Sequence, residues 1–217
     1  MQAIRYNIVE KVLDVPLQNP DYPGLFMGSY KTCFGSWVAE HAIIYTEPLS
    51  PPGVDPLVRI NSACFTGDIF GDRRCDCTEQ LFLTMDMVRE QGGLIIYHLH
   101  HEGRGLGLTA KLSTYKEMAE RGVSTFAAMA ALTNRNDLRS YGSAVLILND
   151  LGVKRLRLVT NNPNKKFVLE QNGFEIAETV GVISTRPNIR QYLKTKQEEQ
   201  GHFIDFEMKP PLNADSA

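Results

Sequence analysis

The chain has 217 residues, of which 43% are hydrophobic and 22% are charged, a composition that excludes a disordered chain and a fibrous repeat. Its formal net charge of −2 lacks the strong positive balance of a duplex nucleic-acid binder, so we expect no nucleic-acid partner, although a local basic pocket stays open.

The first half of the chain predicts two strands, a helix and a third strand. Residues 37–45 (WVAEHAIIY) are typical of a strand, and a proline-rich connection separates them from the second strand at 57–60. From Cys77 to Arg89 apolar residues recur at helical spacing, and Gly92 ends that helix. The apolar run at 94–98 has the length of a strand.

The second half predicts further helices and one more strand. The helix at 108–118 has one apolar face, and a second helix follows at 141–151. Residues 155–160 alternate like a strand, and 162–171 begins with Asn-Pro, which is typical of a helix start. A last helix is expected after Gln191. Strands that alternate with helices predict an α/β (α+β) fold, with a mixed sheet flanked by helices.

We expect a single compact domain over residues 1–217, with a loose polar tail at 209–217; the N-terminal portion, about the first 50 residues, carries fewer signals than the rest. No apolar run reaches the ~18–20 residues that a membrane crossing needs, so we expect no membrane partner. The start of the chain lacks the apolar stretch of a secretory signal. These features favour a cytoplasmic protein.

Three of the four cysteines, Cys64, Cys75 and Cys77, fall within fourteen residues, and Cys33 stands apart. A disulfide framework is unexpected in the cytoplasm, where such a cluster is more often metal-binding or catalytic. Three thiolates are the number of protein ligands expected for a catalytic zinc. The C-x-C pair fits a turn at a helix start, where the helix dipole favours thiolate.

Two alternatives remain open for this cluster. The cysteines resemble small buried hydrophobic residues in their size and polarity, and such residues need no metal. A structural Cys3His site is the other alternative, with His98, His100 or His101 as its fourth ligand.

Three segments suggest phosphate binding. Glu102-Gly-Arg-Gly-Leu-Gly (102–107) and Thr160-Asn-Asn-Pro-Asn-Lys-Lys (160–166) each connect a predicted strand to a helix, where glycines and helix N-termini accommodate anions. In the segment 137–142, Asp137 can orient Arg139 toward a phosphate. Each segment alone also fits an ordinary tight turn, surface lysines or a surface ion pair.

Four motifs in this order resemble GTP cyclohydrolase II of riboflavin biosynthesis. They are SACFTGDIFGDRRCDCTEQL (62–81), HEGRGLGL (101–108), DLRSYG (137–142) and LVTNNPNKK (158–166). The resemblance extends from about residue 57 to 202. It implies a zinc-dependent homodimeric hydrolase with one zinc per chain. Such an enzyme opens the imidazole ring of GTP at C8, releases formate and pyrophosphate, and leaves a diaminopyrimidinone ribosyl monophosphate. Mg2+ would accompany the triphosphate.

The resemblance also implies residue roles. Cys64, Cys75 and Cys77 would hold the zinc. The residues that would line the nucleotide are Arg59, Ile60, Asn61, Ser62, Ala63, Gln80, Glu102, Gly103, Arg104, Thr125, Thr160 and Lys165.

Three further residues would act in catalysis. Tyr115 matches a family tyrosine near the ring-opening chemistry, Asp137 would be the proton acceptor, and Arg139 the nucleophile at the α-phosphate. Since an arginine side chain is almost never deprotonated, chemistry alone favours Arg139 as a transition-state clamp and water as the nucleophile.

The chain departs from the family at Asn61 and Ala63, where the family usually has a histidine and an acidic residue, and at Thr78, where it commonly has glycine. The alternatives are therefore a diverged paralogue that acts on another purine nucleotide or stops at the formamidopyrimidine, and a non-catalytic zinc- and nucleotide-binding regulator. A butanone-phosphate synthase domain, often fused to this family, does not fit the length, so we expect one activity.

Overall fold

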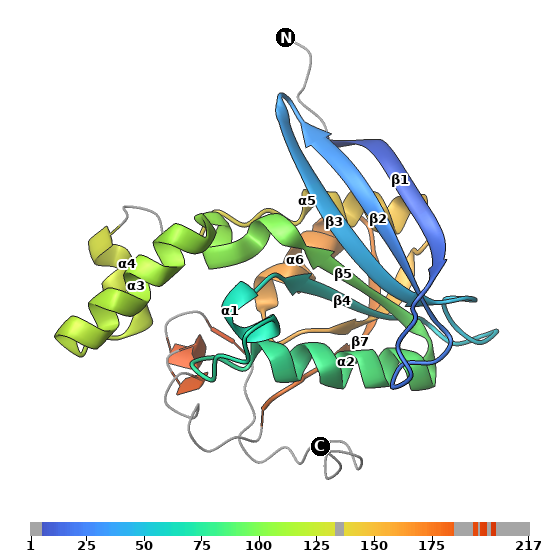
Figure 1. Cartoon of the computed structure of the whole chain (residues 1–217). Helices are drawn as coiled ribbons and strands as arrows, with labels where there is room; N and C mark the ends of the chain where they lie inside the picture. Colours follow the sequence, from blue (N-terminus) through green and yellow to red (C-terminus); the bar gives the residue numbers. More distant parts are fainter. Residues whose placement is uncertain (1–5, 133–136, 185–192, 195, 199–200, 203–217) are drawn as a thin grey trace.

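The fold is built on a seven-stranded mixed sheet with helices on both faces (Figure 1), which confirms the predicted α/β class. The computed structural model describes residues 6–132, 137–184, 193–194, 196–198 and 201–202. Along the sheet the strands follow the order β1-β2-β3-β5-β4-β6-β7.

The elements have the following bounds. The strands are β1 (Tyr6–Pro16), β2 (Leu25–Phe34), β3 (Trp37–Thr46), β4 (Leu57–Ser62), β5 (Gly93–His98), β6 (Arg155–Val159) and β7 (Glu175–Val180). The helices are α1 (Phe65–Asp68), α2 (Cys77–Gln91), the 3-10 segment η1 (Leu99–Gly105), α3 (Gly107–Arg121), α4 (Thr125–Leu132), α5 (Gly142–Asp150) and α6 (Pro163–Gln171).

The sheet has an antiparallel half and a parallel half. β1, β2, β3 and β5 pair antiparallel, whereas β5, β4, β6 and β7 pair parallel. Parallel strands need crossover connections, and the chain supplies them as helices. Because β5 belongs to both halves, it brings residues of β3 beside the carboxyl ends of the parallel strands.

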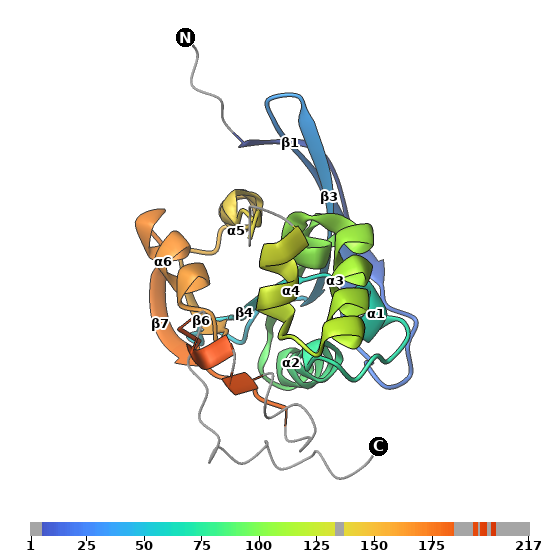
Figure 2. The ribbon, with the colours of Figure 1, turned by 90° about the vertical axis from the view of Figure 1, so that its left-hand side faces the viewer.

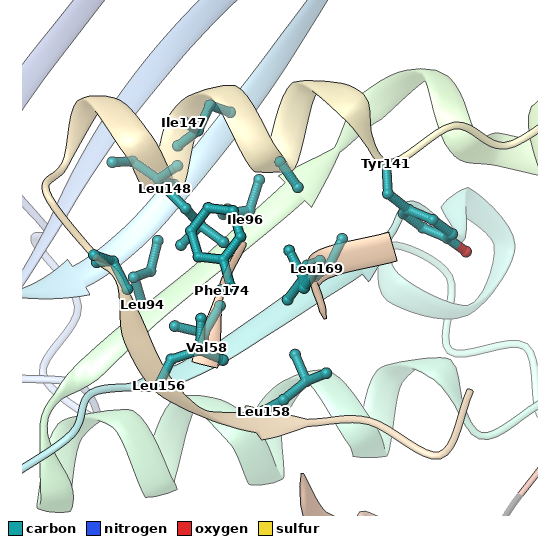
Figure 3. Close-up of a cluster of buried hydrophobic side chains, with 14 of the residues drawn as sticks. Val58, Leu94, Ile96, Tyr141, Ile147, Leu148, Leu156, Leu158, Leu169 and Phe174 are labelled. Carbon is teal, nitrogen blue, oxygen red and sulfur yellow. The ribbon is translucent and has the colours of Figure 1, made fainter. Parts of the chain in front are cut away.

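The main core lies between the sheet and the helices α5 and α6 (Figure 3). Val58 of β4 and Leu94 of β5 pack there against Ile147 and Leu148 of α5 and Leu169 of α6. All five side chains are completely buried. Removing this much apolar surface from water is the main stabilising contribution to the fold.

The opposite face of the sheet packs on α2. Leu57 of β4 and Ile95 of β5 meet Leu81, Met85 and Val88, which follow one side of that helix. Since side chains alternate across a strand, the neighbouring residues of β4 and β5 belong to different faces. This burial on both faces explains why residues 94–97 of β5 form a continuous apolar run.

The predicted helix boundaries largely hold. α2 begins at Cys77, as the C-x-C spacing predicts. The Asn162 side chain caps α6 by accepting a hydrogen bond from the Asn164 backbone N–H, at 2.9 Å, with Pro163 as the first helical residue. Gly122 ends α3 in a left-handed conformation with φ of 65°.

Other elements had no prediction from the sequence. β1, β2, β7, α1 and α4 are additions, and two of these strands extend the sheet at its N-terminal edge (Figure 1). The last helix predicted after Gln191 lies largely outside the described residues, and the loose tail at 209–217 lies wholly outside them. Figure 2 shows the helix pair α3 and α4 on one side of the molecule, with α6 and β7 on the other. Within the described ranges, no helix combines the length and the apolar character that a membrane crossing requires.

Candidate active site

One pocket gathers the segments that follow three parallel strands. Its lining includes Ser62 at the end of β4, Glu102 and Arg104 after β5, and Thr160 and Asn162 after β6. Ligands in α/β sheets collect at the carboxyl ends of strands, so this is the expected place for a site. The three segments that suggested phosphate binding therefore contribute to one pocket.

Most of the predicted site residues line this pocket. Those that do are Arg59, Asn61, Ser62, Ala63, Cys64, Cys75, Cys77, Gln80, Glu102, Gly103, Arg104, Tyr115, Thr125, Arg139, Thr160 and Lys165. Two do not. The Ile60 side chain is completely buried in the core, and only its carbonyl oxygen points toward the site, where it accepts a hydrogen bond from Lys165 Nζ at 2.6 Å. Asp137 stands behind Arg139, to which it is paired.

The three clustered cysteines converge. One sulfur from each of Cys64, Cys75 and Cys77 lies within 4.8 Å of the other two, and the Cys64 and Cys75 sulfurs are 3.6 Å apart. Tetrahedral zinc with Zn–S bonds of about 2.3 Å places its sulfur ligands roughly 3.8 Å apart. The donor set thus fits a zinc ion, with small adjustments.

Gly67 makes the close approach of the sulfurs possible. A Cβ atom at this position would lie 3.0 Å from the Cys64 sulfur and 3.4 Å from the Cys75 sulfur. The C-x-C pair brackets the start of α2, with Asp76 as the residue before the helix. In the part of the chain that the structure describes, the cysteine group includes no histidine nitrogen. The geometry of these residues therefore favours the three-cysteine set over the Cys3His alternative.

A lysine on α3 provides a positive charge at the cluster. Lys111 Nζ lies 3.0 Å from the Cys64 sulfur and 2.9 Å from Glu102 Oε1. Burial alone would lower the pKa of Lys111, but its hydrogen bonds to Cys64 and Glu102 outweigh that effect and raise it. Hydrogen bonds from Cys75 and Cys77, together with Lys111, lower the pKa of Cys64. The hydrogen bond with Cys64 is the largest cause that raises the pKa of Cys75 and of Cys77, so the surroundings favour one thiolate, at Cys64, beside Lys111.

Tyr115 lies one helical turn beyond Lys111 and faces the same cluster. The Arg74 guanidinium stacks on its ring, 4.6 Å from the ring centroid. Burial raises the pKa of Tyr115 to about 12, and a hydrogen bond with Thr66 opposes this only in part. The phenol therefore keeps its proton at neutral pH and can donate a hydrogen bond.

The glycine-rich turn holds the 137–139 segment in place. Gly105 has a φ of 84°, and a Cβ atom there would lie 3.2 Å from the Leu138 Cβ. The Arg104 carbonyl accepts a hydrogen bond from the Leu138 backbone N–H at 2.9 Å. A side chain at position 105 would therefore collide with the 137–139 segment, and glycine is needed there. The sequence pattern did not suggest this role.

Arg139 and Asp137 form a two-point ion pair. Arg139 Nε lies 2.9 Å from Asp137 Oδ1, and its Nη2 lies 2.6 Å from Oδ2. The backbone N–H of Arg139 also donates to the carboxylate at 3.0 Å. Burial tends to raise the pKa of Asp137, but the hydrogen bonds from Arg139 outweigh it and lower the pKa. Asp137 is therefore ionised at neutral pH and fixes the direction of the guanidinium.

The lining of the pocket is strongly basic. Its cationic side chains are Arg59, Arg74, Arg104, Lys111, Arg139, Lys165 and Lys196, and Glu102 is the acidic side chain among its described residues. Burial, together with the charges of Arg59 and Arg139, lowers the pKa of Lys165. Such a concentration of like charge is costly without a counter-ion, and it favours an anionic ligand. The chain as a whole is slightly acidic, so this basic character is local.

A hydrogen-bond network fixes the side chains at the end of β4. Arg59 Nε donates to Asn61 Oδ1 at 2.9 Å, and its Nη2 donates to Gln80 Oε1 at 2.8 Å. The buried Asp76 carboxylate forms an ion pair with Lys196 at 2.9 Å. Burial would raise the pKa of Asp76, but Lys196 outweighs it and lowers the pKa. These contacts hold Arg59 and Gln80 in place at the pocket wall.

Several pocket residues were missed by sequence reasoning. They are Arg74, His101, Lys111, Met129, Asn161, Asn162, Lys196 and His202. Lys111 had a usable signal, because it stands four residues before Tyr115 and so shares its helix face. Arg74 and Lys196 had none, since their positions depend on the path of a loop and of the C-terminal segment.

Comparison with known proteins adds a family match. A family model described as GTP cyclohydrolase II matches residues 26–181. The riboflavin biosynthesis protein RibBA of Cytophaga hutchinsonii is 45% identical over 149 residues, which are 68% of this chain and 36% of that protein. The RibBA of Bacillus subtilis is 42% identical over 158 residues, 72% of this chain and 39% of that protein. The chain thus spans well under half the length of these relatives.

Proposed function

This chain belongs to the GTP cyclohydrolase II family, and from that premise we propose that it hydrolyses GTP. The imidazole ring is opened at C8 with release of formate, and pyrophosphate is released from the triphosphate. The family match confirms the resemblance seen in four sequence motifs. The observation that carries the proposal is the presence, in one basic pocket, of a three-cysteine cluster and of Arg139, which Asp137 holds in place from outside the pocket lining.

Cys64, Cys75 and Cys77 would hold one zinc ion. Zinc bound there supplies a Lewis acid and activates water at neutral pH for hydrolysis at C8 and of the resulting formamide. Three protein ligands are the number that leaves a coordination position for such chemistry. Lys111 supports the thiolates through its contact with the Cys64 sulfur.

Tyr115 serves at the base of the nucleotide. Its phenol is protonated at neutral pH, because burial raises its pKa to about 12. It is fixed by the stacked Arg74 and lies on the helix that also carries Lys111. We assign it the donation of a hydrogen bond to the purine ring as negative charge develops there during ring opening.

Arg139 acts at the α-phosphate as a clamp. Its pairing with the ionised Asp137 stabilises the protonated guanidinium, which opposes a nucleophilic role for Arg139. Its planar fork suits the oxygens of a phosphoryl group in the transition state. Asp137 orients Arg139, and because it lies outside the pocket lining, the role of proton acceptor that the resemblance implies is not assigned to it. Mg2+ would accompany the triphosphate, as it does with nucleotide substrates in general.

An assay of products tests the proposal. Zinc-loaded protein with GTP and Mg2+ is expected to release one formate and one pyrophosphate for each GTP consumed. Cys33→Ser is the matched control, because Cys33 stands outside the cluster on β2 and this variant should keep full activity. Intact GTP after incubation with metal-loaded protein would overturn the proposal. Tight GTP binding without turnover would favour the regulator instead.

Asn61 and Ala63 support a second candidate, an enzyme that stops at the formamidopyrimidine. Asn61 Oδ1 is already engaged by Arg59 and its Nδ2 donates to the Ser62 carbonyl at 3.3 Å. Ala63 presents a methyl group to the pocket beside the first cysteine. Mass spectrometry of the product distinguishes the two outcomes, because a retained formyl group adds the mass of CO.

We also propose that the protein is a homodimer. Support comes from apolar side chains on the N-terminal strands that are more than a third exposed, among them Val9, Val12, Trp37 and Val38. Met27 and Phe34 of β2, the strand between β1 and β3, are exposed as well, and several exposed apolar side chains on one part of a sheet are typical of an interaction surface. Sedimentation should give twice the mass of the chain, and Val12→Lys should shift it toward the monomer. A monomeric wild-type protein at micromolar concentration would refute the dimer.

A further inference from the structure

Three histidines form a second cluster of potential metal ligands. His41 lies on β3, His98 ends β5 and His100 follows in η1. One imidazole nitrogen from each lies within 4.8 Å of the other two. None of the three lines the pocket of the active site. The antiparallel register that places His41 opposite His98 creates this cluster from residues far apart in the sequence.

The ring nitrogens of this cluster are incompletely satisfied. His41 Nδ1 and His98 Nδ1 are 2.7 Å apart. Within the described part of the chain, the buried His98 Nε2 and His100 Nδ1 have no hydrogen-bond partner. A buried polar atom without a partner costs about 1–3 kcal/mol, and such atoms in a folded protein call for an explanation such as a bound ion.

The surroundings of the cluster favour neutral imidazoles. His41 and His98 are completely buried, and His100 is half-buried. Burial lowers the pKa of His41 and of His100 to about 4. The neutral ring is the form that binds metal ions.

A polar relay holds His41 from behind. His41 Nε2 lies 2.8 Å from the Thr32 hydroxyl, which lies 3.0 Å from the Ser143 hydroxyl. Metal-binding histidines are usually oriented in this way, with the second ring nitrogen bonded to a fixed partner. The relay leaves the Nδ1 of His41 directed at His98.

We propose that His41, His98 and His100 bind a second divalent metal ion, of the class that prefers imidazole ligands, with zinc as the first candidate. Three imidazoles are an established ligand set for zinc, and this class of ion also includes nickel and copper. The ion would join β3, β5 and η1, and so fix the start of the segment that leads to Glu102. Trp37, whose ring meets His100 edge-on at 4.8 Å, would cover the site on its outer side.

Metal stoichiometry tests the proposal. Wild-type protein is saturated with zinc, desalted and analysed for zinc per chain. We expect two ions per chain in the wild type and one in His100→Ala, a variant chosen because His100 is the least buried of the three ligands. Leu99→Ala is the matched control: Leu99 is the exposed neighbour of His100 in η1, the substitution removes no ligand, and the variant should retain two ions. One ion per chain in the wild type, unchanged in His100→Ala, would overturn the proposal.

A second measurement separates the two clusters. The double variant Cys64→Ser, Cys75→Ser should keep one ion, and adding His100→Ala should remove it. With cobalt in place of zinc, this ion should lack the intense thiolate-to-metal absorption that the wild-type protein shows. If the cysteine variant does not fold, the zinc content per chain of the wild type and of His100→Ala still tests the proposal. Neither measurement uses GTP, so failure of the proposed function would leave this result unaffected.

Discussion

The cysteine cluster and the histidine cluster lie in contrasting settings. The cysteines stand after β4 and at the start of α2, and all three line the pocket. The histidines stand on β3, β5 and η1, and none of them reaches that pocket. Lys111 places a positive charge beside Cys64, whereas His41 is held by the neutral hydroxyl group of Thr32.

The contrast shows that the position of a group of metal ligands in the fold decides whether the bound ion can take part in catalysis. A metal ion that is held by residues lining a basic pocket can contact an anionic substrate and take part in its reaction. A cluster buried between strands can only hold those strands together. Both sets have three ligands, so ligand number alone does not distinguish a catalytic site from a structural one.

Loss of a thiolate should give the largest effect. Cys75→Ser should remove the zinc of the pocket and reduce formate release to the uncatalysed background, because a serine hydroxyl is a poor zinc ligand. Formate release and zinc content measured on the same preparation check this. The histidine cluster should keep its ion in this variant. If formate release survived with no metal in the pocket, the cysteines would have no catalytic role.

A substitution at the phosphate end of the pocket should reduce pyrophosphate release without changing the zinc content. Arg139→Lys should lower pyrophosphate release by about 100-fold, because an ammonium group lacks the planar fork of donors that fits a phosphoryl group. Zinc content should not change, since the substitution leaves all three cysteines in place and a cation next to Asp137. Pyrophosphate release at the wild-type rate would remove Arg139 from the mechanism.

The charge beside the cysteines should have a smaller effect. Lys111→Met keeps the length of the side chain but removes the charge next to Cys64, and we expect about tenfold weaker zinc binding. Competition with a chelator measures this. Lys116→Met, on the exposed side of the same helix, is the control and should bind zinc like the wild type. Equal affinities in both variants would refute the role of Lys111.

The relay behind His41 should give the smallest effect on metal binding. Thr32→Val should weaken the second ion by less than about tenfold and destabilise the fold by about 1–3 kcal/mol, since it leaves His41 and Ser143 without their shared partner. Urea unfolding with and without zinc measures both quantities. GTP turnover should stay near the wild-type value. A fold stability unchanged by the substitution would mean that the relay contributes nothing.

Much of the fold from β3 to α6 could be predicted from the sequence. β3, β4, α2, β5, α3, α5, β6 and α6 all follow apolar periodicity and recognisable end signals. β1 and β2 could not be predicted, because their buried and exposed residues alternate irregularly, and β1 is in addition an edge strand that is largely exposed. The family match begins at residue 26, which is earlier than the motifs suggested and includes β2 and β3.

The candidate site could be predicted where its residues stand close together in the chain. Cys64, Cys75 and Cys77 are such a set, and so are Asp137 and Arg139. Lys196 could not be predicted as a partner of Asp76, because the two are 120 residues apart and the ion pair depends on the path of the C-terminal segment. Ile60 was placed in the site with its neighbours, but β4 alternates sides and turns its side chain into the core.

The sequence by itself determined the chemistry that this protein can offer: the thiolates, the guanidinium groups and the order of strands and helices. Those features arise from local patterns, in which residue type and spacing act over a few turns of chain. Tertiary structure alone decided which groups meet. Strand pairing brought His41 to His98 across 57 residues and set Lys111 against Cys64, because contacts of that range depend on how the whole sheet and its helices pack.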